Sequence, residues 1–294
     1  MKSTNYKFDD IFSACIKGKK DRVFTEIEKK QNNYLRAAHK IFKLYGGYQI
    51  YYVYNDLSAL YGWDENELRS MYDKLRRKES AGRKYYEKLR EVAVNGKCQI
   101  CMYGSVESLD HYLPKESYPS LAISAHNLIP SCISCNGKKS THKPKSLQDQ
   151  TIHFKFDSYF KSNWLEAYYN HNLRRITFFP NKSMYSEGSV DQKRIMEHLR
   201  VHELYELYEV LALKEIREIV VRASKNDLSL KETVELERDL VLENEKYSPG
   251  SIFTLNQWRL ATFEALLKSE YFLRDGMNML DDGSFFQPSV FDFE

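Results

Sequence analysis

The sequence has no long run of apolar residues. Residues 1–10 contain no apolar segment of the kind that signal peptides use. No other segment reaches the roughly 20 apolar residues that a membrane-spanning helix needs. These absences argue against a secreted or integral membrane protein. They predict a protein of the cytoplasm, where reducing conditions disfavour disulfides.

The sequence also lacks internal repeats and low-complexity linkers, which argues against repeat arrays and long disordered connections. Its 294 residues, of which 42% are hydrophobic, are enough to bury a sizeable core. Tyrosine and phenylalanine are abundant, with 22 and 16 residues, and we expect most of them in that core. A chain of this length predicts two or three compact units.

Cysteine is scarce, but four of the five cysteines form a pattern. Cys98 with Cys101 and Cys132 with Cys135 make two Cys-x-x-Cys pairs separated by thirty residues. Thiolates three residues apart can occupy two corners of a zinc tetrahedron. The pattern therefore predicts one structural zinc ion, with two disulfides or four unrelated core cysteines as the alternatives. Cys15 fits a small buried residue.

Residues suited to metal binding and proton transfer lie between and beside the two pairs. They are Asp110, His111, Asn127 and Asn136, with Lys139 close behind. Histidine titrates near neutral pH and can take a proton from water. Carboxylate and amide oxygens are the ligands that Mg²⁺ prefers. Such groups can hydrolyse a phosphodiester, because the reaction needs an activated water and a cation at the phosphate.

This segment resembles the HNH endonucleases, in the subclass whose ββα-metal fold is stapled by zinc. The shared pattern is a cysteine knuckle, a strand with Asp-His, a loop with Asn-Leu, and a second knuckle that leads into a helix. The resemblance covers residues 95–145 and implies that His111 is the general base. It also implies that Asp110 and Asn136 hold Mg²⁺ or Mn²⁺. Asn127 would brace the loop and orient the base.

Two features leave alternatives open. Alternation along a strand places Asp110 and His111 on opposite faces, so that both can serve one cleft only with a local twist or bulge. Asn136 stands where many HNH members have histidine. Taken singly, an Asp-His pair is usually a surface dipeptide, and asparagines such as Asn127 are usually turn or cap residues. Only their register with both cysteine pairs favours a nuclease site.

The net charge of +3 is unevenly distributed. Lys and Arg number 20 against 13 acidic residues in 1–94, 6 against 3 in 95–145, and 18 against 25 in 146–294. The basic part contains the candidate site, as expected for a polyanionic substrate. The lysines that we expect to contact phosphates are Lys115, Lys138, Lys139, Lys143 and Lys145. The alternative is that they only keep the segment solvated.

Helical periodicity and capping residues predict the flanks. We expect helices over 22–45, 65–93, 190–223, 229–246 and 256–274, and a strand over 173–179. Basic residues between Lys74 and Arg90 fit a solvated helix face or a strip along nucleic acid equally well. The predicted fold is mainly α, with a small ββα-metal zinc module inserted between two helical regions. The predicted domains are residues 1–94, 95–145 and 146–294.

The sequence thus predicts a metal-dependent endonuclease that cuts DNA or structured RNA such as tRNA. The alternative is a zinc-stapled adaptor without catalysis that binds nucleic acid or protein. An enzyme with a catalytic zinc, such as a deaminase, fits poorly. Four cysteines close the zinc shell, and no His-x-Glu accompanies the second pair.

The segments 109–115 and 127–132 are similar to one branch of the HNH nucleases in particular. That branch is found in bacterial antiphage systems, of the Septu type and some retron-associated ones, beside an ABC-like ATPase. The resemblance implies a role in antiviral defence and an ATPase partner that gates the nuclease. The acidic helical half, with the acidic-aromatic tail that follows Gly276, would then be the docking surface.

Overall fold

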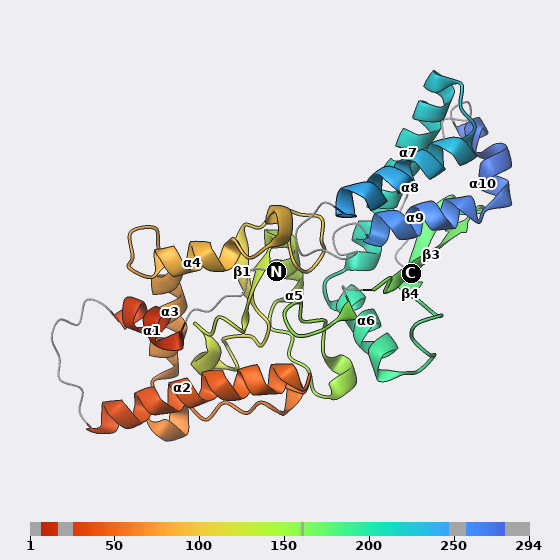
Figure 1. Cartoon of the computed structure of the whole chain (residues 1–294). Helices are drawn as coiled ribbons and strands as arrows, with labels where there is room; N and C mark the ends of the chain where they lie inside the picture. Colours follow the sequence, from red (N-terminus) through yellow and green to blue (C-terminus); the bar gives the residue numbers. More distant parts are fainter. Residues whose placement is uncertain (1–6, 17–25, 160–161, 247–256, 280–294) are drawn as a thin grey trace. The chain divides into compact units, whose positions relative to one another are not determined.

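The computed structural model describes residues 7–16, 26–159, 162–246 and 257–279 (Figure 1). The chain forms two compact units. Unit 1 comprises residues 1–160 and 188–203, and unit 2 comprises residues 161–187 and 204–294. The acidic and aromatic residues of the predicted docking tail, from 280 onward, lie outside the described residues.

Helices form the N-terminal part of unit 1. They are α1 (Phe8–Ile16), α2 (Glu26–Gly47), α3 (Glu65–Arg76) and α4 (Arg83–Arg90), joined in part by 3-10 turns at Tyr51–Val53, Ala59–Tyr61 and Val94–Gly96. Helix α1 packs on α2 and α3, and α3 packs on α4. Their apolar side chains share one buried cluster with Leu109 and Leu128. Burial of apolar surface therefore ties these helices to the two strands that carry Leu109 and Leu128.

The helix expected over 65–93 is in fact two helices, α3 and α4. Arg77 has extended backbone angles (φ −60°, ψ 130°), and the chain turns before α4 begins. A Cβ atom at Gly82 would lie 2.9 Å from the Cα of Leu75, so this close turn requires glycine. The start of the first helix was predicted correctly, because Asp64 accepts a hydrogen bond from the backbone N–H of Asn66 at 2.8 Å.

A ββα succession follows in unit 1. Strands β1 (Ser108–His111) and β2 (Leu128–Ser131) pair antiparallel, and α5 (Ile133–Lys139) begins two residues after β2. Helix α5 packs on β1, and α4 packs on both strands. This is the order of elements predicted for the segment with the cysteine pairs. Further 3-10 turns lie at Pro119–Leu121, between the strands, and at Leu147–Asp149.

Helix α6 (Val190–Val201) completes unit 1. Ser189 caps it by accepting a hydrogen bond from the Gln192 N–H at 3.2 Å, as the sequence predicts. A buried ion pair fastens the helix, with Arg194 Nη2 2.7 Å from Asp157 Oδ2. The Arg194 side chain also donates to the backbone oxygens of Gln150 and Thr151. The helix is thus held by a charged pair inside unit 1.

Unit 2 is a two-stranded sheet packed with helices. Its elements are β3 (Leu165–Asn170), β4 (Arg175–Pro180), α7 (Leu204–Asn226), α8 (Leu230–Lys246), α9 (Gln257–Leu267), α10 (Glu270–Asp275) and a 3-10 turn at Gly276–Met279. The strands are antiparallel, with α9 on β3 and α7 on β4. Helices α7, α8 and α9 pack on one another. The predicted strand over 173–179 is β4, whereas β3 was not predicted.

One predicted helix is again divided. The stretch 190–223 forms α6 and the greater part of α7, with a break at His202 and Glu203. Glu203 has a φ of 50°, in the left-handed region that ends a helix. Leu199, Leu204 and Leu211 of this stretch are buried.

The chain is therefore mainly helical, with a small two-stranded sheet beside the cysteine pairs in its middle, as the sequence predicts. The three-part division at 94 and 145 stays a prediction about domains. Among the helices in the described ranges, none is long and apolar enough to cross a membrane.

Candidate metal centre and hydrolytic site

The sulfur atoms of Cys98, Cys101, Cys132 and Cys135 lie within 4.8 Å of one another, and all four side chains are buried. None of the five cysteines forms a disulfide, so neither alternative, disulfides or scattered core cysteines, describes this group. Four buried sulfurs around one point are a donor set that suits Zn²⁺. The cluster is consistent with the predicted structural zinc.

Backbone N–H groups point at three of the sulfurs. The contacts are Ile100 N to Cys98 Sγ, Gly104 N to Cys101 Sγ and Cys135 N to Cys132 Sγ, each at 3.4 Å. Such hydrogen bonds stabilise negative charge on sulfur. Hydrogen bonding with Cys101 lowers the pKa of the Cys132 thiol and raises that of Cys135. The N–H contacts therefore favour negative charge on the three sulfurs that they reach.

Gly104 closes the first knuckle at a position where a side chain would be crowded. Its carbonyl accepts a hydrogen bond from Cys98 N at 2.7 Å. A Cβ atom at this position would lie 3.0 Å from the Cβ of Cys132 and 3.2 Å from its sulfur. The two knuckles therefore lie close together at Gly104, a residue that sequence reasoning had not singled out.

Two histidines at the end of α6, which sequence reasoning also missed, contact both knuckles. His198 Nε2 lies 3.2 Å from the carbonyl oxygen of Ile100, and His202 Nδ1 lies 3.4 Å from that of Cys135. Burial lowers the pKa of His198 to about 4, so that it is neutral at pH 7. In the sequence, a spacing of four residues indicates only that the two histidines share one face of a helix. It does not identify the groups that they contact.

Asp110 is buried under α5, beside a lysine. Its Oδ1 accepts a hydrogen bond from Lys139 Nζ at 3.2 Å, and the same ammonium donates to the backbone oxygen of His111 at 2.6 Å. Within the described residues, the buried Oδ2 of Asp110 has no hydrogen-bond partner. Burial raises the pKa of Asp110 to about 6, although the Lys139 charge acts in the opposite direction. One carboxylate oxygen is therefore available to a further cation.

His111 faces the other side of β1. Its Nε2 lies 2.8 Å from the carbonyl oxygen of Ala122, and its ring contacts that of Tyr72 with centroids 4.4 Å apart. A carbonyl oxygen can only accept, so Nε2 carries the proton and Nδ1 keeps the lone pair. Burial lowers the pKa of His111 to about 4. The ring is thus a neutral imidazole at pH 7, with Nδ1 as its basic nitrogen.

The two predicted asparagines occupy different settings. Asn127 is fully buried, and its side-chain amide bonds both the N–H (2.8 Å) and the carbonyl (2.9 Å) of Leu113. It therefore braces the loop after β1. Asn136, on α5, donates to Ser108 Oγ at 3.2 Å. Ser108 and Asp110 share one face of β1, so Asn136 lies on the Asp110 side of the strand.

The five predicted phosphate-binding lysines fall into three groups. Lys143 and Lys145 are exposed. Lys115 and Lys138 form ion pairs with Glu116 and Glu203. Lys139 is buried, and it would have to leave Asp110 before it could reach a phosphate.

The N-terminal helical part holds the loop that passes over His111. Asp56 Oδ2 accepts hydrogen bonds from both the N–H (2.9 Å) and the hydroxyl (2.7 Å) of Ser120. Arg69 on α3 donates to the backbone oxygen of Glu116 at 2.9 Å. His39 Nδ1 lies 2.8 Å from Ser124 Oγ. No sequence motif predicts these contacts, because the partners are 47 to 85 residues apart in the sequence.

Two known proteins are similar in sequence to this chain. Protein ea31 of Escherichia phage lambda is 25% identical over 219 residues, which cover 71% of this chain and 74% of ea31. The Septu protein PtuB of Bacillus thuringiensis is 45% identical over 56 residues, which cover 17% of this chain and 22% of PtuB. No family model matches the chain, and no solved structure matches it.

These similarities are partial. The ea31 match is long but distant, and the PtuB match is closer but spans less than a quarter of that protein. What they add is a weak relationship to a component of a Septu system, alongside a buried four-cysteine cluster that suits zinc.

Proposed function

We propose that this protein is a metal-dependent HNH endonuclease that hydrolyses phosphodiester bonds in DNA or in structured RNA such as tRNA. The observation that carries the proposal is the ββα unit beside the cysteine cluster. Its first strand presents a carboxylate with an unpartnered oxygen, Asp110, and a neutral histidine, His111. A general base and a hard metal ligand are groups that phosphodiester hydrolysis uses. Because Asp110 and His111 face opposite sides of β1, both can reach one phosphate only with a local twist of the strand.

His111 acts in this proposal as the general base. The Ala122 carbonyl fixes the proton on Nε2, so that Nδ1 can accept a proton from the attacking water. Tyr72 supports the ring from one side, and its hydroxyl donates to the backbone oxygen of Leu109 at 2.6 Å. Asn127 orients the base indirectly, because it fixes the loop that follows the strand.

Asp110 and Asn136 would hold Mg²⁺ or Mn²⁺. The unpartnered Oδ2 of Asp110 and the side-chain oxygen of Asn136, on the same side of β1, are hard donors of the kind these ions prefer. A bound ion would supply charge neutralisation at the phosphate and at the departing oxygen. Lys139 would leave Asp110 as the ion binds, and would then join Lys115, Lys138, Lys143 and Lys145 as a phosphate contact.

The biological setting follows from the relative named a Septu protein and from the similarity to the antiphage branch of HNH nucleases. We propose that the nuclease is an effector of antiviral defence in the cytoplasm, gated by an ABC-like ATPase partner. Co-purification with such an ATPase, and an effect of ATP on cleavage, would test this part. A protein that is fully active alone would contradict the gating.

The central experiment compares the wild-type protein with His111→Ala on duplex DNA, single-stranded DNA and tRNA, with and without Mg²⁺. We expect cleavage that requires Mg²⁺, and a loss of about 100-fold or more in His111→Ala, since a positioned base contributes about 10²–10⁴ in rate. His171→Ala, in unit 2, is the matched control and should cut normally. Zinc content should be equal in all three proteins. Full activity of His111→Ala would contradict the assignment of His111 as the general base.

A second function is favoured by one observation, the burial of the site. Asp110 and His111 are only 3% and 7% exposed, and an ammonium already contacts the carboxylate. Such a site suits a zinc-stapled adaptor that binds nucleic acid or protein without cutting. The adaptor is supported if the wild-type protein binds nucleic acid but cuts none of the three substrates with Mg²⁺ or Mn²⁺.

A further inference from the structure

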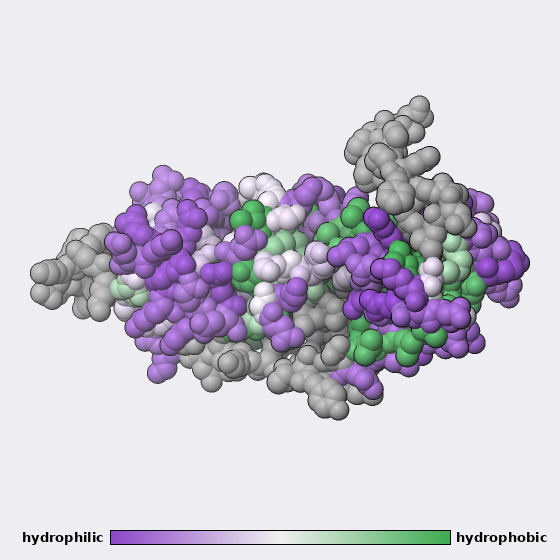
Figure 2. Space-filling model, turned by 90° about the horizontal axis from the view of Figure 1, so that it is seen from above, coloured by the Kyte–Doolittle hydropathy of each residue, from purple (hydrophilic) through white to green (hydrophobic). Residues whose placement is uncertain are grey.

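An open groove of about 650 Å³ lies in unit 1 at the turn between α3 and α4. Basic residues dominate its lining, namely Arg76, Arg77, Lys78, Arg83 and Arg90. Asp73 and Glu107 are the acidic residues that line it. Figure 2 shows strongly hydrophilic surface over the part of unit 1 that contains these helices. The lining of the groove does not include Lys115, which follows β1, Lys138, which lies in α5, or Lys143 and Lys145, which follow α5.

Arg76 is paired with Asp73, and Arg83 and Arg90 are both paired with Glu87, so part of the positive charge is neutralised inside the protein. Arg77 and Lys78 are exposed, and no ion pair within the described residues engages them. Arg76 lies 3.5 Å from Asp73, but both side chains are more than half exposed, so this pair is weak. The outer wall of the groove therefore presents cations to solvent.

Helix electrostatics accounts for some of the basic residues that line the groove. Arg76 in the last turn of α3 complements the negative end of that helix. Arg83 begins α4, where a cation opposes the helix dipole, and the first turn of α4 contains no acidic residue. Arg83 nevertheless forms an (i, i+4) ion pair with Glu87, and Arg90 lies in the last turn of α4, so both contribute to their helix. Arg77 and Lys78 stand between the two helices without such an ion pair to any described residue, which favours a role in binding.

The inner wall is preorganised. The guanidinium groups of Arg83 and Arg90 lie over the Tyr86 ring, 4.9 and 5.9 Å from its centroid. Arg90 is held further by Glu87, at 3.0 Å, and by the backbone oxygen of Val106, at 2.8 Å. A planar guanidinium fixed in this way loses little entropy when it binds a phosphate.

The groove connects to the candidate site through two aromatic rings. Tyr86 lies next to Tyr72, with ring centroids 6.3 Å apart, and Tyr72 contacts the ring of His111. Both tyrosines are buried, so this contact is fixed. A strand lying in the groove would be on the side of β1 that His111 faces, rather than on the α5 side.

We propose that the α3–α4 groove binds the sugar-phosphate backbone of a nucleic acid, without reading its sequence, and extends the substrate surface beyond the ββα unit. The proposal rests on the proposed nuclease function, because it names the tract that holds the substrate beside His111. Arginines paired with backbone phosphates position a duplex or a single strand and carry no base recognition. Binding should therefore be similar for unrelated sequences and should weaken with salt.

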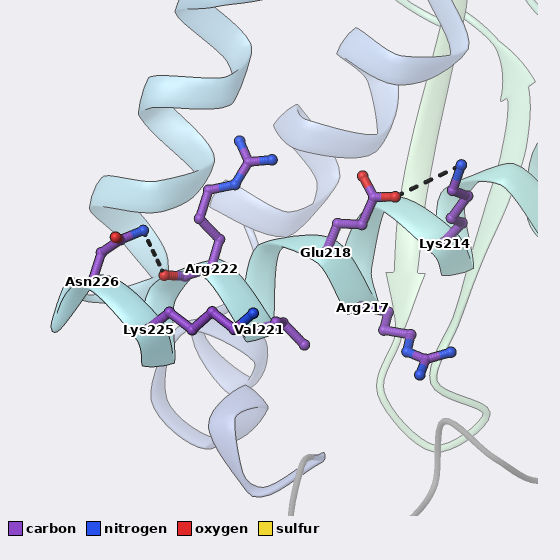
Figure 3. Close-up of a pocket in the computed structure, with 7 residues that line it drawn as sticks. All are labelled: Lys214, Arg217, Glu218, Val221, Arg222, Lys225 and Asn226. Atoms are coloured by element: carbon purple, nitrogen blue, oxygen red, sulfur yellow. Dashed lines mark hydrogen bonds and ion pairs between the residues drawn. The ribbon is translucent and has the colours of Figure 1, made fainter.

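The test is the triple variant Arg76→Glu, Arg77→Glu and Lys78→Glu. Its matched control reverses Lys214, Arg217 and Lys225, which line a second basic groove on α7 in unit 2 (Figure 3). The two variants change the net charge equally, so a difference between them reports the place of the charge. Circular dichroism and zinc content check that both proteins fold.

The readout is fluorescence anisotropy of a labelled DNA duplex and a labelled RNA stem, measured without divalent ions so that nothing is cut. We expect the α3–α4 variant to bind at least 10-fold more weakly than wild type, with a salt slope smaller by about 2–3 between roughly 50 and 200 mM salt. The α7 control should stay within twofold of wild type. Equal losses in the two variants, or no loss in the first, would overturn the proposal.

A milder variant keeps the test valid if the triple variant does not fold. Arg77→Gln with Lys78→Gln removes only two exposed charges and should weaken binding about threefold to tenfold. The binding result is independent of cleavage. If the wild-type protein cuts nothing while the groove variants lose binding, the proposed nuclease function is refuted and the proposed role of the groove is supported. If the wild-type protein cuts and the variants bind as well as it does, the nuclease function is supported and the proposed role of the groove is refuted.

Discussion

The two small sheets of this protein are built alike but buried differently. In β1 and β2 every residue except Ser108 is buried, including the polar Asp110, His111 and Ser131. In β3 and β4 buried residues are interspersed with partly or fully exposed ones such as Tyr168 and Thr177. The second sheet shows the pattern of a strand pair with one solvated face. The first sheet buries polar groups that a purely structural hairpin would not need.

The same contrast extends to the units that contain the sheets. Five of the eight histidines are buried, and all five lie in unit 1. Unit 2 buries few polar or charged side chains among its described residues: Asn181, Thr233, Glu237, Gln257 and Thr262. Buried polar groups lower stability unless they are paired, so their concentration in unit 1 indicates a function that requires them. Four changes test this contrast.

The largest effect should come from Cys132→Ser. Structural zinc contributes its binding free energy to folding, on the order of 10 kcal/mol, so loss of one ligand should cost unit 1 about 5 kcal/mol or more. Hydrogen exchange measured by mass spectrometry should show β1, β2 and α5 losing protection, while β3 and β4 keep theirs. Cys15→Ala, a buried cysteine outside the cluster, is the control and should cost far less. Equal loss in both sheets would break the contrast.

The second effect concerns the charged pair inside unit 1. Asp157→Asn leaves Arg194 buried without its partner, and we expect a cost of about 3–5 kcal/mol in urea unfolding. The matched change in unit 2 is Glu237→Gln, whose partners Arg222 and Arg259 are 47% and 27% exposed. Solvent can replace these pairs, so the cost there should be about 1 kcal/mol or less. Similar costs at the two positions would contradict the prediction.

The third effect is a pH dependence. Burial lowers the pKa of Lys155 to about 7 from its usual 10.5. Between these values the unfolded chain holds a proton that the folded chain does not, so the free energy of unfolding should rise with pH by about 1.4 kcal/mol per unit. Lys155→Met should remove this rise, and the exposed Lys145→Met should keep it. Urea midpoints at pH 7.5 and 8.5 provide the measurement. Parallel pH profiles for wild type and Lys155→Met would refute the assignment.

The local parts of the candidate site could be predicted from the sequence. The four cysteines, the β1 strand with Asp110, and the helix that starts after Cys132 depend on short spacings, which a chain can specify alone. Caps were found for the same reason, because Ser229 and Glu232 bond each other within one turn. The roles of His111, Asn127 and Asn136 in catalysis remain predictions.

The missed parts depend on contacts between distant residues. Lys139 was assigned to phosphate, but its ammonium contacts Asp110, 29 residues away, and no spacing rule links the two. His198 reaches the first knuckle across 98 residues. The break at 77–82 was missed because polar and basic residues continue through the turn, and only the approach of Gly82 to Leu75 reveals it. Packing, rather than periodicity, decides these features.

The smallest expected effect is in the solvated face of the second sheet. Tyr168, on β3, stands opposite Thr177 on β4, and its side chain is 56% exposed. An exposed cross-strand pair contributes about 0.2–1 kcal/mol, so Tyr168→Ala should lower the free energy of unfolding by less than about 1 kcal/mol. Ser131→Ala in the first sheet removes a buried hydroxyl that lies 3.0 Å from Ser108 Oγ. It should cost more, about 1–3 kcal/mol, because Ser108 then loses a buried partner. If Tyr168→Ala proves the costlier change in urea unfolding, burial is not what separates the two sheets.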